Sequence, residues 1–275
     1  MKLEFYCPLW GMESLDFAEF CGNVKKEGYD GIEMSFPMES ISPEERDRRA
    51  FLVRDNGLKL IAQHWETFEP DLDKHLAEYE KRLRNLAAVK PDFISSQTGR
   101  DWFRFEENLE IIALADSIAE ETGLKITHET HRSKMLFAAH ITRHFLEKLP
   151  DLRLTLDISH WCTVAETLLE DQEDAVALAL SRTDHIHARV GFAESPQVPD
   201  PSAPEWEEVL NRHLGWWDEV LHQAAASGRD TFTITNEFGP YPYMIHTPYE
   251  NRPIADQWQI NRDMKDRLRE RYKSL

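Results

Sequence analysis

Short apolar segments alternate with longer segments of helical periodicity along nearly the whole chain, and this alternation restricts the fold more than any other feature. Strands are expected at 3–7, 30–35, 58–64, 92–97, 125–130, 153–157, 184–189 and 231–236. Helices are expected at 17–28, 43–57, 72–89, 104–122, 133–148, 164–180, 204–227 and 254–271. Eight such units in 275 residues favour an α/β protein, a single-domain (β/α)8 TIM barrel spanning 1–275. An open doubly wound sheet is the alternative, because counting units does not prove closure.

The connections between the expected elements carry helix-end signals but no phosphate-binding motif. Ser42, Pro43 and Glu45 have the pattern of an N-cap, a first-turn proline and a capping-box glutamate. No G-x-G-x-x-G or Walker-type loop follows any expected strand, which argues against a nucleotide-binding fold. The irregular stretches 191–203 and 238–253 lie beyond C-terminal strand ends, where barrel enzymes carry lids and substrate loops.

The charge balance restricts the partners. Fifty acidic residues against 32 basic ones give a formal net charge of −18, which repels nucleic acid and anionic membranes. We therefore expect neither nucleic acid nor a membrane as a partner. Three widely spaced cysteines fit a reducing compartment, and no secretory leader or long apolar run is visible, so we expect a cytoplasmic protein. A homo-oligomer is compatible with the sequence.

Four expected strands end in residues that commonly bind metals: Glu129, Asp157, His187 and Glu237. They are separated by 28, 30 and 50 positions, and the first two gaps are about one strand–helix unit long. Side chains alternate between the two faces of a strand. In each of these strands the apolar residues share the face opposite the ligand, so the ligands are expected to point into the barrel at its C-terminal end. The same alternation turns Glu33 inward, which makes it a further candidate for substrate binding.

Three carboxylates and one imidazole favour a divalent cation, with Mn²⁺, Mg²⁺ or Co²⁺ fitting an oxygen-rich shell best and Zn²⁺ as a further option. Acids at strand ends also cap helices or lie in solvent, and each one taken alone is more often structural. Four on inward-facing positions favour a metal site, because adjacent carboxylates without a cation repel one another.

Several neighbouring residues are candidates for substrate binding, each with a structural alternative. His160 and Arg189 could hold substrate, but His160 could equally open the next helix and Arg189 could pair with Glu237 or Glu33. Arg132 could line the mouth of the barrel or neutralise nearby acids. The facing of His64 at the end of its strand is ambiguous, so a buried structural role has equal weight.

Trp10, Trp65 and Trp102 follow early strands and could form aromatic walls that stack on a sugar, or serve only in packing. Cys162 has no visible base partner, and no nucleophilic role is expected for it.

Five short motifs occur in order along nearly the whole chain: GYDGIEM at 28–34, HETHR at 128–132, D-x-x-H at 157–160, H-x-H at 185–187 and NE at 236–237. In this order the chain resembles the xylose-isomerase-like superfamily of sugar (phosphate) isomerases and epimerases. The resemblance implies a metal held by Glu129, Asp157, His187 and Glu237. In the ketose 3-epimerase branch, the two glutamates also transfer protons. That branch usually has an arginine where this chain has Ala193, so the resemblance does not define the substrate.

The expected activity is therefore that of a divalent-metal-dependent sugar isomerase or epimerase. It would act on a ketose or a related polyol or keto acid, by proton transfer through an enediolate with Glu129 and Glu237 as acid and base. The alternatives are an aldose–ketose isomerase that uses a metal-assisted hydride shift, and a barrel that binds a sugar or metal without turnover. DNA-repair endonucleases of the superfamily fit less well, because they need more metal ligands and a basic groove.

Overall fold

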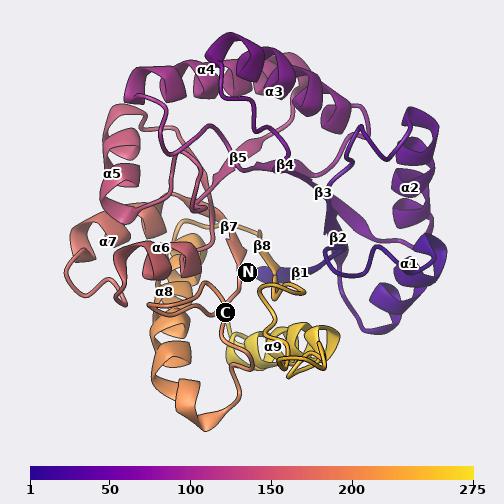
Figure 1. Cartoon of the computed structure of the whole chain (residues 1–275), viewed down its shortest axis with the longest axis vertical. Coiled ribbons are helices and arrows are strands. Elements are labelled where there is room, and N and C mark those ends of the chain that lie inside the picture. The colour runs from indigo at the N-terminus through magenta and orange to yellow at the C-terminus, as the bar shows by residue number, and fades with distance from the viewer.

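A computed structural model describes all residues, 1–275, and shows a closed barrel of eight parallel strands in chain order (Figure 1). The strands are β1 (Lys2–Pro8), β2 (Gly31–Met34), β3 (Lys59–His64), β4 (Phe93–Ser96), β5 (Ile126–Glu129), β6 (Leu154–Leu156), β7 (Thr183–His187) and β8 (Thr231–Thr235). Closure comes from β1 and β8, which pair in parallel from Lys2–Thr231 to Tyr6–Thr235. The chain is a (β/α)8 TIM barrel, as predicted, and the open sheet is excluded.

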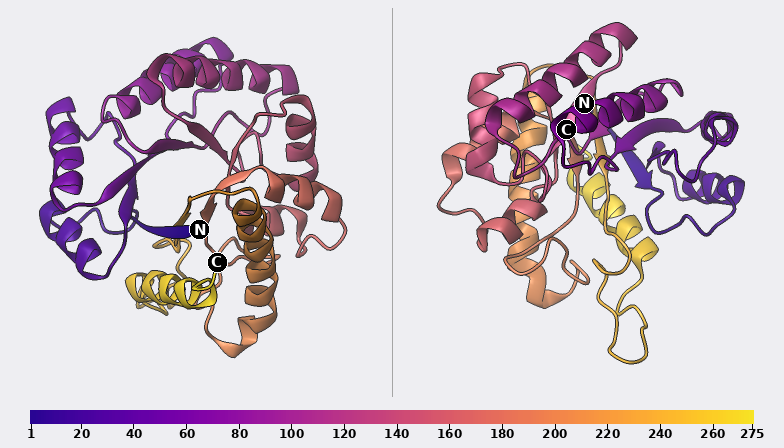
Figure 2. Two further views of the ribbon diagram at one scale, coloured as in Figure 1. Left: turned by 180° about the vertical axis from the view of Figure 1, so that it is seen from behind. Right: turned by 45° about the horizontal axis from the view of Figure 1, so that its top comes forward.

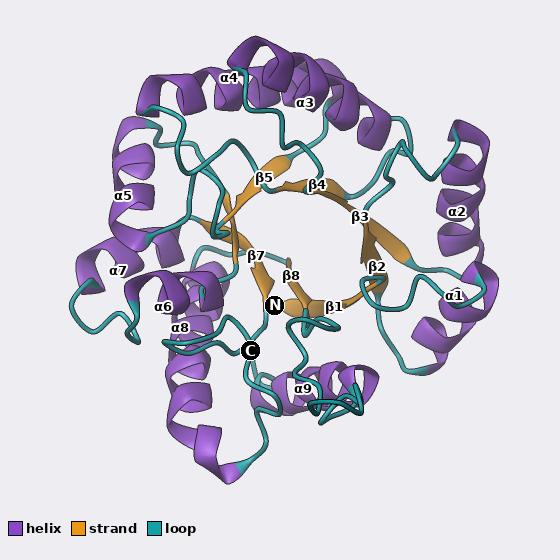
Figure 3. Ribbon diagram, viewed as in Figure 1, coloured by secondary structure: helices purple, strands orange, loops and turns teal.

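Helices surround the ring of strands on its outside (Figure 3). They are α1 (Phe17–Lys26), α2 (Pro43–Asp55), α3 (Leu72–Ala87), α4 (Phe105–Thr122), α5 (Ala139–Lys148), α6 (Ser159–Ala165), α7 (Glu173–Ser181), α8 (Glu207–Ala226) and α9 (Gln257–Arg271), with a 3₁₀ turn at Pro204–Trp206. The two chain ends meet at the barrel, where the amino group of Met1 donates to the carbonyl of Leu275 at 2.9 Å (Figure 2). No helix combines the length and apolar character that crossing a bilayer requires.

Two predicted helices differ from those observed. The helix expected at 133–148 begins only at Ala139, because the preceding residues form a loop in which Met135 donates its backbone N–H to Thr98 at 3.0 Å. The helix expected at 164–180 is two helices, α6 and α7. Glu166 and Leu169 between them have left-handed backbone angles, with φ of 54° and 62°, which no α-helix accommodates.

The expected cap of α2 is observed in part. Ser42 Oγ accepts the backbone N–H of Glu45 at 3.2 Å, so Ser42 is the N-cap, and Pro43 occupies the first turn. The side chain of Glu45 forms salt bridges to Arg48 and Arg49 on the same helix. The serine therefore caps the helix, while the glutamate stabilises its exposed face.

The main core lies between the strands and the helices and contains 62 buried residues. The barrel interior is different, because only Tyr6, Ile61 and Phe93 form an apolar cluster there. Gly31 is part of this crowding, since a Cβ on it would lie 2.4 Å from the Tyr6 ring. Above this cluster the interior is polar, and the charged side chains of the candidate site project from that polar layer.

Candidate functional site

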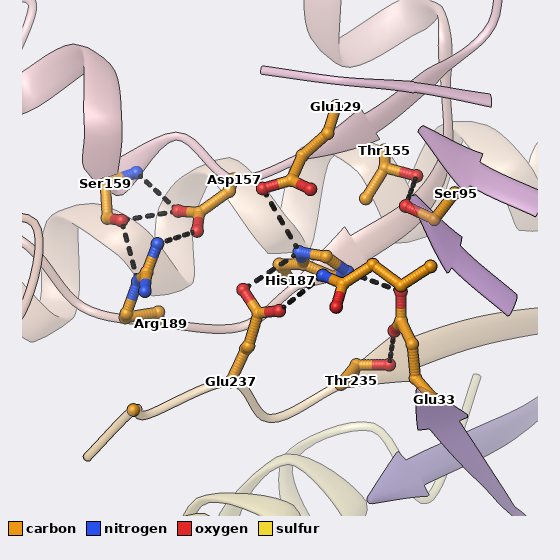
Figure 4. Close-up of polar contacts among 12 residues, drawn as sticks. Glu33, Ser95, Glu129, Thr155, Asp157, Ser159, His187, Arg189, Thr235 and Glu237 are labelled. Carbon is orange, nitrogen blue, oxygen red and sulfur yellow. Dashed lines mark hydrogen bonds and ion pairs between the residues drawn. The ribbon is translucent and has the colours of Figure 1, made fainter. Parts of the chain in front are cut away.

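The four strand-end residues meet at the C-terminal end of the barrel (Figure 4). Glu129 and His187 are the last residues of β5 and β7, Asp157 follows β6 directly, and Glu237 lies two residues after β8. One ligand atom from each of these side chains can be chosen so that all four atoms lie within 4.8 Å of one another. All four residues are buried. The predicted inward facing of these side chains thus produces one compact cluster.

Three polar atoms of this cluster lack hydrogen-bond partners. Both carboxylate oxygens of Glu129 and Nδ1 of His187 are buried without one, although Glu237 Oε2 lies 3.1 Å from that nitrogen. Buried polar atoms are normally paired, so unpaired atoms converging on one point need an explanation. A divalent cation bound among them would satisfy them all, and an oxygen-rich set with one imidazole suits such an ion.

The pKa shifts of the four side chains also indicate that the cluster lacks a charge-balancing cation. Burial raises the pKa of Glu129 to about 7, against the opposing charge of His187. Burial also raises the pKa of Asp157, which Arg189 opposes. For Glu237 burial acts upward, but the charge of His187 outweighs it and the pKa is lowered. Burial acts to lower the pKa of His187, yet the surrounding carboxylates raise it well above its usual value. Three carboxylates thus share two cationic groups, the His187 ring and the Arg189 guanidinium, which leaves the cluster short of positive charge.

Glu33 holds His187 in the orientation that a metal ligand needs. His187 Nε2 donates to Glu33 Oε1 at 3.0 Å, so the other ring nitrogen, Nδ1, points at Glu129 and Glu237. Glu33 also accepts from Thr235 Oγ1 and lies 3.2 Å from His185 Nε2. A carboxylate that fixes the ring of a ligand histidine is the usual outer partner of a protein metal site. Glu33 points inward as predicted, and its contacts are with these side chains of the barrel interior.

Arg189, Asp157 and His160 form the opposite side of the cluster. Arg189 is fully buried. Its Nη2 forms an ion pair with Asp157 Oδ2 and also lies 2.7 Å from His160 Nε2. The other oxygen of Asp157 accepts the backbone N–H of Ser159, the first residue of α6, at 3.1 Å. The His160 ring stacks on His131 with centroids 3.8 Å apart. Asp157 keeps free lone pairs on Oδ2, so it can still bind a cation beside Arg189.

The structure does not bring His64 into the site. His64 lies between the barrel and α3, where Nδ1 is 3.1 Å from Ser96 Oγ and Nε2 is 2.8 Å from Thr67 Oγ1. Both ring nitrogens are thus occupied, which corrects the prediction that His64 contacts substrate in favour of its buried structural alternative. Gln63, one residue earlier, points inward instead, and its amide donates to Glu237 Oε1 at 2.9 Å.

Gln63 is a site residue that the sequence analysis missed. Alternation puts Gln63 on the face opposite His64, but both faces of this strand carry apolar residues, so the pattern did not show which one points inward. The structure decides it, because Gln63 pairs in register with Ser95, whose Oγ donates to Thr155 Oγ1 inside the barrel. Tyr243 was also missed, and no strand pattern could have shown it, because it lies in the irregular segment after β8.

The mouth of the barrel is lined by aromatic side chains on one side. Trp10 packs edge-on against Tyr243, with ring centroids 5.0 Å apart. The guanidinium groups of Arg132 and Arg189 lie 5.4 Å and 4.8 Å from the Tyr243 ring centroid. Arg132 is therefore near the mouth, as predicted, and no carboxylate pairs with it within 4.0 Å. Trp65 and Trp102 are partly exposed, so the aromatic wall is open to solvent there.

Comparisons with known proteins identify relatives by structure alone. No protein-family model matches the sequence, and no curated protein matches it. A D-psicose 3-epimerase from Clostridium cellulolyticum is similar at a TM-score of 0.64 and 18% identity, with 96% of both chains covered. A xylose isomerase-like TIM barrel protein from Mycobacterium smegmatis, in complex with magnesium, is similar at 0.58 and 12% identity, covering 87% of this chain and 92% of that one.

A further solved structure of the same architecture is the endonuclease IV from Thermus thermophilus. Its TM-score is 0.59 at 16% identity, with 98% of this chain and 100% of that chain covered. At such identities the likeness establishes the fold. The chain therefore has the fold of the xylose-isomerase-like TIM barrels, the superfamily that its motifs resemble.

Proposed function

We propose that this chain is a divalent-metal-dependent isomerase or epimerase that acts on a ketose or a related polyol or keto acid. The observation that carries the proposal is the buried cluster of Glu129, Asp157, His187 and Glu237, in which three ligand-type atoms have no hydrogen-bond partner. The epimerase and the magnesium-bound barrel with the same fold support it.

These four residues would hold the cation, with Glu33 and Gln63 keeping His187 and Glu237 in place. When bound, the cation would polarise a substrate carbonyl and the adjacent hydroxyl, which acidifies the C–H bond between them. Mn²⁺, Mg²⁺ or Co²⁺ suits the three carboxylates best, and Zn²⁺ is the next choice.

Glu129 and Glu237 are the candidates for proton transfer. They extend from different strands and approach the cluster from opposite sides of His187 (Figure 4). One carboxylate would remove the proton from the substrate carbon, forming an enediolate, and the other would return a proton to the far face. Both carboxylate oxygens of Glu129 lack hydrogen-bond partners, so the carboxylate has free lone pairs with which to accept a proton and later release it.

The test is turnover of ketoses and aldoses by the metal-loaded protein in D₂O, followed by NMR. Deuterium at the epimerised carbon is the expected result. Conversion without label would instead indicate a hydride shift between substrate carbons. Turnover of no sugar at all would favour a barrel that only binds a sugar or metal.

The metal site has a separate test that does not depend on turnover. The double variant Glu237→Gln/His187→Ala should bind less than one Mn²⁺ per chain at concentrations that saturate the wild type. Full occupancy in that variant would contradict the proposed ligand set.

We also propose that the partner is a small molecule and that the protein works in the cytoplasm. All three cysteines are buried and unpaired, which suits a reducing compartment. The formal charge of −18 disfavours DNA as a substrate, even though an endonuclease shares the fold. Incubation with duplex DNA containing an abasic site should therefore give no cleavage under conditions where a sugar is converted.

A further inference from the structure

Lys134 is a buried cation without a counter-ion. The structure has four buried Lys or Arg side chains: Arg82, Lys134, Arg189 and Lys265. Each of the other three forms a salt bridge to a carboxylate, but no carboxylate lies within 4.0 Å of Lys134. Its Nζ makes a single hydrogen bond, to the carbonyl of Trp65 at 2.9 Å. Two of its three N–H donors are therefore unused, which is costly for a buried ammonium group.

A second cation with unused donors lies beside it. Nε and Nη1 of Arg100 are buried and have no hydrogen-bond partner. Arg100 and Lys134 flank the same aromatic ring, with the guanidinium carbon 5.6 Å and the ammonium 4.8 Å from the centroid of Phe68. Burial lowers the pKa of Lys134 to about 8, and the charge of Arg100 acts in the same direction. The two cations thus repel each other beside a ring that is half exposed.

The loops that carry these cations are held rigidly. Asn108 Nδ2 donates to the carbonyl of Arg100 at 2.9 Å, and its Oδ1 accepts the backbone N–H of Arg100 at 3.2 Å. Gly99 has a φ of 63°, and a Cβ there would lie 2.1 Å from Asn108 Oδ1, so only glycine fits. On the other loop, Lys134 donates its backbone N–H to His131 at 3.2 Å. Hydrogen bonds therefore hold the backbone at both residues.

The position of the pair places it next to the candidate metal site. Lys134 follows Glu129 by five residues in the loop after β5, and Arg100 follows β4 by four residues. Neighbouring strands β4 and β5 end at the same C-terminal face of the barrel. The charge of Glu129 acts on Lys134, along with those of Glu66 and Asp101, but none of these carboxylates pairs with it. The two cations therefore belong to loops at the same end of the barrel as the metal cluster, and Lys134 lies within range of the charge of Glu129.

We propose that the substrate carries an anionic group, a carboxylate or a phosphate, which Lys134 and Arg100 bind at the barrel mouth. This inference rests on the proposed function and names the substrate class for that same site. An anion would accept the unused N–H donors of both side chains and remove their mutual repulsion, and such charge-assisted hydrogen bonds are the strong ones. Because the chain has a net charge of −18, most of its surface repels anions. Two neighbouring cations without counter-ions therefore give an anionic substrate a favourable place to bind.

The first test measures binding and does not need turnover. Titration calorimetry of the Mn²⁺-loaded protein compares D-sorbitol with D-gluconate and D-sorbitol 6-phosphate, which differ in carrying no anion, a carboxylate or a phosphate. At least one anionic probe should bind 10-fold or more tightly than sorbitol, and the better one identifies the anion. Lys134→Met should weaken that preference, and the double variant Lys134→Met/Arg100→Met should abolish it. Lys134→Arg should retain most of it, since the charge and donors remain.

The control is Lys148→Met, which removes an exposed lysine without an ion pair from nearby α5. It should leave all three affinities unchanged. An anionic preference that survives in the double variant Lys134→Met/Arg100→Met would mean that the anion binds the metal directly, and it would overturn the proposal. Equal binding of the three probes, or binding of none, would overturn it as well. A thermal unfolding curve for each variant separates lost binding from lost folding.

The second test separates this inference from the proposed function. With a ketose and its carboxylate and phosphate analogues as substrates, Lys134→Met should raise KM for the anionic substrate by 10-fold or more and change kcat less. A wild-type enzyme that prefers the neutral ketose would refute the anion subsite while leaving the proposed isomerase intact. Absence of turnover together with a Lys134-dependent anion preference would refute the isomerase and leave the subsite standing.

Discussion

Glu33→Gln is the sharpest test of how the cluster holds a metal. In the native site, Glu33 accepts three contacts, from His185, His187 and Thr235. The substitution keeps the size of the side chain but replaces one oxygen with an NH₂ group. An NH₂ group can only donate hydrogen bonds, whereas the native carboxylate accepts one from each of its three partners. In the variant, the NH₂ group therefore meets another donor, either His187 Nε2 or one of the other two partners, and the two cannot pair. The His187 ring then either tilts or moves its proton to Nδ1, the atom that faces the cluster.

The expected loss of metal affinity follows from the position of Glu33, which contacts the ligand His187 but is not itself a ligand. Loss of such a partner typically weakens metal binding by about 10–100-fold. A factor of ten corresponds to about 1.4 kcal/mol, so the loss of binding free energy should be about 1.4–2.8 kcal/mol. Removing a ligand, as in His187→Ala, should cost more than Glu33→Gln does.

The assay is competition for Mn²⁺ between the protein and a fluorescent chelator, at fixed pH and ionic strength. The matched control is Glu4→Gln, which changes another buried glutamate at the opposite end of the barrel, where it pairs with Lys2 and Lys59. Glu4→Gln should leave metal affinity unchanged, even where it lowers stability. Wild-type affinity in a folded Glu33→Gln protein would refute the idea that Glu33 sets the orientation of His187.

Three further outcomes test other parts of the site. Glu129→Gln should lower kcat by about 10²–10⁴-fold, because an amide cannot transfer the proton, whereas retained activity would remove Glu129 from the mechanism. Because burial puts the pKa of Glu129 at about 7 and the carboxylates raise that of His187, Mn²⁺ must displace protons. Affinity should therefore rise with pH through about 7, and calorimetry in buffers of different ionisation enthalpy should show proton release; a pH-independent affinity would contradict this. Asn108→Ala should lower the free energy of unfolding in urea by about 1–3 kcal/mol, because it leaves the buried carbonyls of Arg100 and Phe103 unpaired, and an unchanged midpoint would show that water replaces the amide.

The sequence predicted the barrel well because its signals are local. Alternating apolar residues fix the facing of a strand, and eight repeats of strand and helix leave few topologies. This reasoning placed Glu129, Asp157, His187 and Glu237 together from their strand-end positions. It failed where no local period exists, as in the loop at 133–138 and the turn between α6 and α7, because long-range packing and left-handed residues decide those segments.

Where one face of a strand is apolar, the sequence by itself determined which side chains face the barrel interior, since a two-residue period follows from the chemistry of an extended backbone. Only the tertiary structure decided which of them touch. Glu33 bonds His187 across 154 residues, and Gln63 bonds Glu237 across 174. Such contacts depend on strand register and ring closure, which no local pattern encodes. The pairing of Arg100 with Lys134 over Phe68 depends on three loops whose shapes come from packing, and for that reason it became visible only in the folded protein.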